Sequence, residues 1–127
     1  MIVGMNHFTV IAEDRQKTLD FYVGLLGLKE GWRPDLGFDG AWLYGDGTQA
    51  ILHLYFDRKP PAQRAGVIDH MAFSATGLKA TLAALEARRV EYACRQQKGT
   101  GIWQVFVHDP NGAKVELDFS PEEPAPQ

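Results

Sequence analysis

The stretch KVELDF, residues 114–119, shows the pattern that decides the fold. Its side chains alternate between apolar and polar, as in a strand with one buried face and one open face. The polar face carries Glu116, which stands 63 positions after His53. The same interval separates His7 from His70. Two pairs of potential metal-binding side chains therefore recur at one spacing, which indicates an internal repeat.

The predicted elements occur in the same order in both halves of the chain, a strand, a helix and three further strands. The first half has them at 1–11, 15–26, 28–33, 41–44 and 49–56, and the second at 67–74, 78–89, 90–95, 102–107 and 113–119. Asp14 is expected to cap the first helix, and Gly27 to end it. The predicted fold class is α+β, with modules at about 1–57 and 67–119, a linker at 58–66 and a disordered tail at 120–127.

The composition limits which kinds of binding partner are expected. The chain has 127 residues, 45% of them hydrophobic and 23% charged, and a formal net charge of -3, which suits one compact domain. Charges are scattered and apolar runs are short, so neither nucleic acid nor a membrane is expected as a partner. The first residues do not resemble a signal peptide, which makes a cytoplasmic location the default expectation. Cys94 is the single cysteine, so no disulfide is expected within the chain.

Strand alternation predicts where the candidate metal ligands point. His53 shares its strand face with Ile51 and Tyr55, and Glu116 lies on an entirely polar face. If the two halves pack as equivalents, the repeat places all four candidates around a pseudo-twofold axis in one cleft. Three imidazoles and one carboxylate form a donor set that divalent transition metals favour. A small molecule bound in that cleft is the expected partner.

Beyond these patterns, the chain resembles the vicinal oxygen chelate superfamily, the family of glyoxalases, bleomycin resistance proteins and extradiol dioxygenases. The resemblance runs from Met1 to about Phe119 and is carried by NHFTV, TLDFYVGLLGLKEG, IDHMAF and HDPNGAKVELDF. It implies two βαβββ modules whose cupped mixed sheets hold one metal. It also implies that His7, His70 and Glu116 take metal positions, with His53 on the fourth. Similar chains are usually homodimers, with sites often assembled across the interface.

The resemblance leaves the reaction open. A ring-cleaving extradiol dioxygenase is the first interpretation, with Fe²⁺ favoured and Zn²⁺, Ni²⁺, Mn²⁺ or Co²⁺ possible. Two histidines and one glutamate would hold the iron, while His53 would serve as acid and base beside Tyr55. The alternative is a glyoxalase I-like lyase or isomerase in which His53 is the fourth ligand. The family's glyoxalases carry a carboxylate or amide ligand there, which weakens that alternative.

Two further classes of function are less favoured by the sequence. A fosfomycin-type thiol transferase would want a tyrosine where this chain has Phe106. A binding protein without catalysis would have no reason to keep all four candidate ligands. Gln104 and Phe106 share a strand face that by resemblance looks into the cleft, so both are expected to contact substrate. His108 is expected in a solvent-facing turn.

Overall fold

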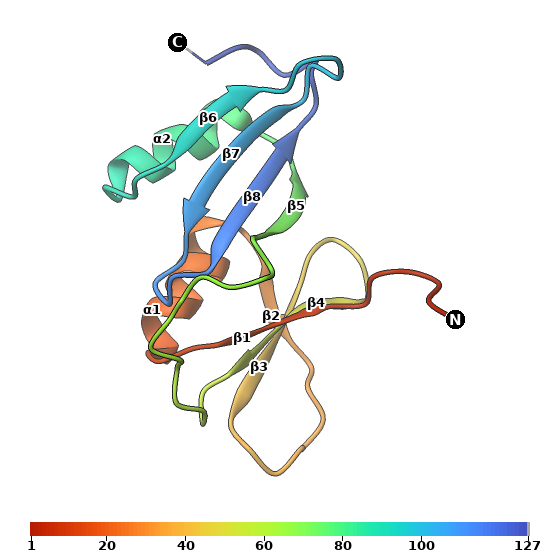
Figure 1. The fold of residues 1–127 in the computed structure, drawn as a ribbon, viewed down its shortest axis with the longest axis vertical. Coiled ribbons are helices and arrows are strands. Elements are labelled where there is room, and N and C mark those ends of the chain that lie inside the picture. The colour runs from red at the N-terminus through yellow and green to blue at the C-terminus, as the bar shows by residue number, and fades with distance from the viewer. Residues whose placement is uncertain (127) are drawn as a thin grey trace. The chain divides into compact units, whose positions relative to one another are not determined.

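The computed structural model describes residues 1–126 and divides into two compact units, Met1–Gln63 and Arg64–Gln127. The first unit contains β1 (Phe8–Ile11), α1 (Arg15–Leu19), the π-helical segment η1 (Asp20–Leu25), β2 (Lys29–Gly31), β3 (Gly40–Tyr44) and β4 (Ala50–Tyr55). Its sheet has the order β1-β4-β3-β2 (Figure 1). β1 runs parallel to β4, and the other pairs are antiparallel.

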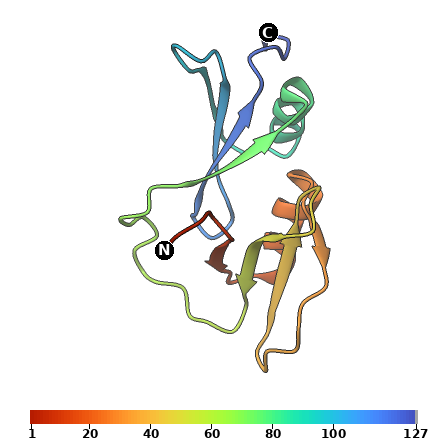
Figure 2. The ribbon, with the colours of Figure 1, turned by 90° about the vertical axis from the view of Figure 1, so that its right-hand side faces the viewer.

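The second unit repeats this plan. It contains β5 (Met71–Ala75), α2 (Leu78–Ala87), β6 (Ala93–Gln96), β7 (Trp103–His108) and β8 (Lys114–Phe119), in the sheet order β5-β8-β7-β6. α2 lies along one face of this sheet (Figure 2). The registers also agree, because Thr9 pairs with His53 and Ala72 with Glu116, each shifted by the same interval. The α+β class and the internal repeat are therefore confirmed.

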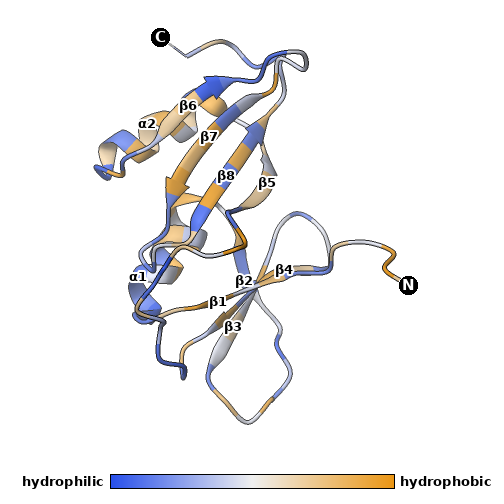
Figure 3. Ribbon diagram, viewed as in Figure 1, coloured by the Kyte–Doolittle hydropathy of each residue, from blue (hydrophilic) through white to orange (hydrophobic). Residues whose placement is uncertain are grey.

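Each sheet has a core face and a more polar face. In the first unit, Leu43, Leu52 and Leu54 are fully buried, whereas their neighbours Trp42 and Tyr55 are half-buried. In the second unit, hydrophobic and hydrophilic residues alternate along β8 (Figure 3). The apolar residues of β8 face the core together with one side of α2, namely Val115, Leu117, Phe119, Leu78, Leu82 and Leu85. Period-two alternation thus sets which side chains remain for a site.

The first helix begins and ends where its residues predict. The Asp14 side chain accepts a hydrogen bond from the Lys17 backbone amide at 2.9 Å, and Gly27 adopts a φ of 83° just after the helix. A left-handed residue at this position ends helices, and glycine adopts it without steric cost. The π-helical part was not predicted, and its wider turn shows in the bond from the Leu26 amide to the Phe21 carbonyl. Among the described residues, no helix has the length and apolarity to cross a membrane.

Several predicted boundaries are wrong. Parallel pairing begins at Phe8 opposite Leu52, and at Met71 opposite Val115. Residues before those points have no ladder partner, so His7 and His70 each stand one position before a strand and not inside it. This places both imidazoles at strand entrances.

The tail differs from expectation as well. The Glu123 carboxylate accepts hydrogen bonds from the backbone amides of Gly77 and Leu78, both at 2.7 Å. These amides begin α2, whose N-cap Gly77 has no side chain to satisfy them. Gln127, the last residue of the tail expected to be disordered, lies outside the described residues.

Candidate metal centre

In the first unit, His53 lies between two aromatic rings. Its imidazole stacks on that of His7, with centroids 3.6 Å apart and planes 12° from parallel. On its other side it stacks on Trp42, with centroids 4.3 Å apart. His53 and Trp42 are direct cross-strand partners on β4 and β3, which explains the second contact. The two stacks fix the plane of the His53 ring.

The nitrogens of His53 have different environments. The side chain is 8% exposed, and its Nε2 is buried without a hydrogen-bond partner. The hydrogen bond between the ring and the Ala50 backbone therefore falls on Nδ1. Burial lowers the pKa of His53, and the neighbouring His7 lowers it further. A neutral imidazole with Nδ1 bound to the backbone keeps the Nε2 lone pair free, which is how histidines ligate metals.

In the second unit, His70 and Glu116 form the corresponding pair. His70 Nε2 lies 3.4 Å from Glu116 Oε1, and His70 Nδ1 donates to Asp69 Oδ2 at 2.7 Å. His7 has the same support, because its Nδ1 donates to Asn6 Oδ1 at 2.7 Å. An oxygen partner on Nδ1 leaves Nε2 as the nitrogen that can bind a metal, and such partners commonly orient metal-binding histidines.

Glu116 is buried at 7% exposure. Burial raises the pKa of its carboxyl group, and a hydrogen bond and negative charge from Asp118 raise it further. The neighbouring His70 and a hydrogen bond with Gln104 act in the opposite direction. Arg95 Nε donates to Gln104 Oε1 at 3.1 Å, so Gln104 is itself held in place. A nearby cation would favour the charged form of such a buried carboxylate.

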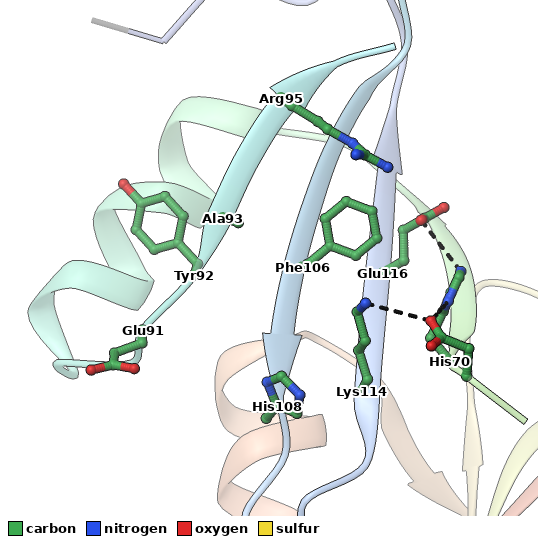
Figure 4. A pocket seen from close by; sticks show the side chains of 10 residues that line it. His70, Glu91, Tyr92, Ala93, Arg95, Phe106, His108, Lys114 and Glu116 are labelled. Carbon is green, nitrogen blue, oxygen red and sulfur yellow. Dashed lines mark hydrogen bonds and ion pairs between the residues drawn. The ribbon is translucent and has the colours of Figure 1, made fainter. Parts of the chain in front are cut away.

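A cavity of about 510 Å³ opens beside this pair. Its lining residues are Asp69, His70, Glu91, Tyr92, Ala93, Arg95, Phe106, His108, Lys114 and Glu116. Figure 4 shows Phe106 facing His70 and Glu116, with Arg95 reaching across the same space. The ring of Phe106 meets that of His70 edge-on, with centroids 6.0 Å apart. Phe106 thus lies where a substrate contact was expected.

The other residues considered for the site differ in whether they line this cavity. Gln104 is buried next to Glu116 and does not line the cavity. His108 ends β7 and is exposed, as its position before a turn predicted, and it also lines the open cavity. Tyr55 follows His53 on the same strand face, with its ring edge-on to Phe38 at 5.1 Å.

The four candidate ligands are divided two and two between the units. Among the residues that the structure describes, no group of three or more His, Cys, Asp or Glu side chains that could hold a metal is found. The residues nevertheless fit a divalent transition metal, because each pair offers nitrogen or carboxylate donors and His53 Nε2 has no protein partner. Sequence reasoning missed Asn6 and Asp69, although they precede the two histidines and keep the 63-residue interval.

Comparison with known proteins gives one family. Residues 4–117 match the model of the Glyoxalase/Bleomycin resistance protein/Dioxygenase superfamily. A curated relative, glyoxylase I 4 of Arabidopsis thaliana, is 29% identical over 124 residues, covering 91% of this chain and 70% of that protein. A glyoxalase/dioxygenase from Nostoc punctiforme has a similar structure, with a TM-score of 0.76 at 20% identity over 94% of this chain and 92% of that one. The trypanothione-dependent glyoxalase I of Leishmania major gives 0.70 at 22% identity, over 93% and 87%.

Proposed function

We propose, because this chain belongs to the glyoxalase/bleomycin resistance protein/dioxygenase superfamily, that it is a divalent-metal-dependent enzyme acting on a small molecule with two vicinal oxygens. One observation carries the proposal: each unit holds a donor pair, His7 with His53 and His70 with Glu116, and the histidine Nδ1 atoms are engaged elsewhere. These four side chains would hold the ion. When bound, it supplies Lewis-acid stabilisation of negative charge on the substrate oxygens.

The surroundings of His53 favour a ligand over an acid or base. Its Nδ1 is held by the backbone and its burial keeps the ring neutral, so it is poorly placed to exchange protons with substrate. Its ring also lies against that of His7, another proposed donor. With His53 as a fourth donor, the protein would hold the ion through three imidazoles and one carboxylate, a set that suits Lewis-acid chemistry on two substrate oxygens. Ring cleavage requires room for dioxygen as well as the substrate, so a fourth protein ligand favours a reaction without oxygen.

This assignment favours a glyoxalase-type isomerase or lyase over the extradiol dioxygenase that the residue pattern puts first. The likeness to a relative named glyoxylase I 4 supports the same choice. In such a reaction a base moves a proton between adjacent carbons of the substrate. Of the three carboxylates that line the cavity, Glu116 is the buried one, and we propose it as the base in addition to its role as a metal ligand, with Gln104 and His70 orienting it. Phe106 would pack against the substrate.

An extradiol dioxygenase remains the second candidate. The set of His7, His70 and Glu116 matches the two histidines and one carboxylate that hold ferrous iron in such enzymes. In that case His53 and Tyr55, which share a strand face, would handle the proton of a catechol. The two candidates differ in their need for oxygen, which makes them easy to separate.

We further propose that the protein is a homodimer. Large apolar residues stand two positions before both candidate histidines and are exposed, Met5 at 76% and Ile68 at 69%. These two positions are related by the same repeat, so each unit would offer an equivalent apolar edge. Sedimentation at micromolar concentration should give a dimer. A monomer that still binds metal and turns over substrate would contradict this proposal.

The test of function uses metal-free protein reloaded separately with Ni²⁺, Co²⁺, Zn²⁺ and Fe²⁺. Each form is given hemithioacetals of 2-oxoaldehydes with a panel of thiols, and catechols in an oxygen electrode. Isomerisation with Ni²⁺, Co²⁺ or Zn²⁺ and no oxygen uptake is the expected result. Oxygen consumption with Fe²⁺ and catechol would instead favour the dioxygenase, and no turnover with any metal would refute both.

Substitutions test the ligands themselves. His70→Ala and Glu116→Ala should each lose the metal while the fold remains, because each removes one donor from a sheet already formed. His108→Ala is the matched control, since His108 lines the same cavity outside the proposed donor set. Full metal occupancy in His70→Ala or in Glu116→Ala would show that the substituted residue is not a metal ligand.

A further inference from the structure

The guanidinium of Arg33 lies on the first sheet, in the space left by the missing side chain of Gly40. An added Cβ at Gly40 would lie 2.8 Å from Arg33 Nη2 and 3.1 Å from its Cζ, so the guanidinium lies directly over Gly40. Gly40 pairs with Tyr55, and Trp42 with His53, on neighbouring strands. Because alternate residues of a strand share a face, Arg33 lies on the same face as His53.

One donor nitrogen of Arg33 has no partner in the described part of the protein. Its Nη2 is buried without a hydrogen-bond partner. None of the ion pairs among the described residues includes it. Phe38 contacts the guanidinium, with Cζ 4.9 Å from the ring centroid. A ring beneath a guanidinium interacts with its face, whereas the N–H donors point outward in its plane.

The neighbouring Arg58 provides a contrast. It lies over the rings of Tyr55 and Phe38 in the same cluster, but its Nε pairs with Asp57 at 3.3 Å. Arg33 is therefore the cation of this cluster without a carboxylate. Leaving a buried charged donor unpaired is costly, which makes the position suited to an anion that arrives with a ligand.

We propose that Arg33 binds a carboxylate of the substrate, so that the substrate carries an anionic group in addition to its two vicinal oxygens. This inference rests on the proposed function and narrows its substrate class. The planar guanidinium fork matches a carboxylate with two parallel hydrogen bonds. The half-buried rings of Trp42 and Tyr55 on the same face suit a flat or aromatic substrate body.

The test measures binding without metal, so it does not depend on the proposed reaction. Benzoate and its neutral isostere benzamide are titrated into chelator-treated protein and followed by NMR at the Gly40 amide and Arg33 Nε. Wild type should bind benzoate about tenfold more tightly than benzamide, which is the scale of a charged hydrogen bond. Arg33→Gln should reduce benzoate affinity to that of benzamide, and Arg33→Lys should restore part of it.

Arg58→Gln is the matched control and should leave benzoate affinity unchanged, because Arg58 already has Asp57. Equal binding of the two probes to wild type, absence of saturable benzoate binding, or undiminished binding in Arg33→Gln would each overturn the proposal. The spectra of each variant report its fold, and Arg33→Lys keeps the charge if Arg33→Gln fails to fold. A protein that binds benzoate through Arg33 but binds no metal would refute the proposed function alone.

Discussion

Replacing His53 by an apolar ring should stabilise the metal-free protein while weakening its stabilisation by metal. The imidazole is 8% exposed and its Nε2 has no partner, a defect that costs about 1–3 kcal/mol. The hydrogen bond to the Ala50 backbone, which the substitution removes, contributes about 0.5–1.5 kcal/mol. Phe retains the stacking on His7 and Trp42. His53→Phe should therefore raise the free energy of unfolding by about 1 kcal/mol.

The assay is urea unfolding followed by circular dichroism in the presence of chelator, and again with excess metal. At a metal concentration about a hundred times the dissociation constant, wild type should gain about 2.7 kcal/mol, and His53→Phe much less. His53→Leu, closer to histidine in volume, guards against a steric effect of Phe. His7→Phe is the control, because His7 is exposed and its Nδ1 is satisfied by Asn6, so no gain without metal is expected.

The reasoning would be refuted if both His53 variants lost about 1 kcal/mol or more without metal. That result would mean that His53 is a structural residue whose hydrogen bonds stabilise the fold. An equal response of wild type and variants to added metal would remove His53 from the donor set even if the apo stabilities agreed with expectation.

Three further predictions concern the second unit. The backbone amides of Leu78 and Gly77 hold the pKa of Glu123 below its ordinary 4.5. The hydrogen bonds from these amides to Glu123 should therefore stabilise the start of α2 fully above pH 4.5, and this stabilisation should be lost as the pH falls through the lowered pKa. Hydrogen exchange at these amides should report this, and equal exchange in Glu123→Gln at neutral pH would contradict it. Burial raises the pKa of the Cys94 thiol above its usual 9.0, so labelling at pH 7 should be slower than in urea-unfolded protein; equal rates would show that the thiol is not protected. Leu85→Ala should lower the free energy of unfolding by about 2–5 kcal/mol because Leu85 is fully buried, and a loss below about 1 kcal/mol would place it outside the core.

Local patterns predicted the features that depend on local physics. Alternation along 114–119 gave the buried and open faces of β8, and the interval between His53 and Glu116 gave the repeated register. The Asp14 cap and the Gly27 ending follow from backbone requirements that operate within one turn. The candidate ligands could be named because a repeat keeps equivalent positions in equivalent environments.

Features that depend on contacts distant in sequence were not predictable in this way. Where β1 starts depends on where β4 offers a partner, which left His7 outside the strand. The hydrogen bonds from Gly77 and Leu78 to Glu123 join residues some 45 positions apart, so no local pattern shows them. Likewise, the position of Arg33 over Gly40 requires knowing how β2 and β3 pair.

The central claim, one divalent ion held by His7, His53, His70 and Glu116, is tested most directly by metal stoichiometry. Four proteins are compared: wild type, His7→Ala, Glu116→Ala and the His108→Ala control. They are dialysed together against the same buffered concentration of free Ni²⁺ and analysed by elemental spectrometry. Wild type and the control should retain one nickel per chain, and the two ligand variants about a tenth as much or less. Equal nickel in all four proteins would contradict the proposed metal centre.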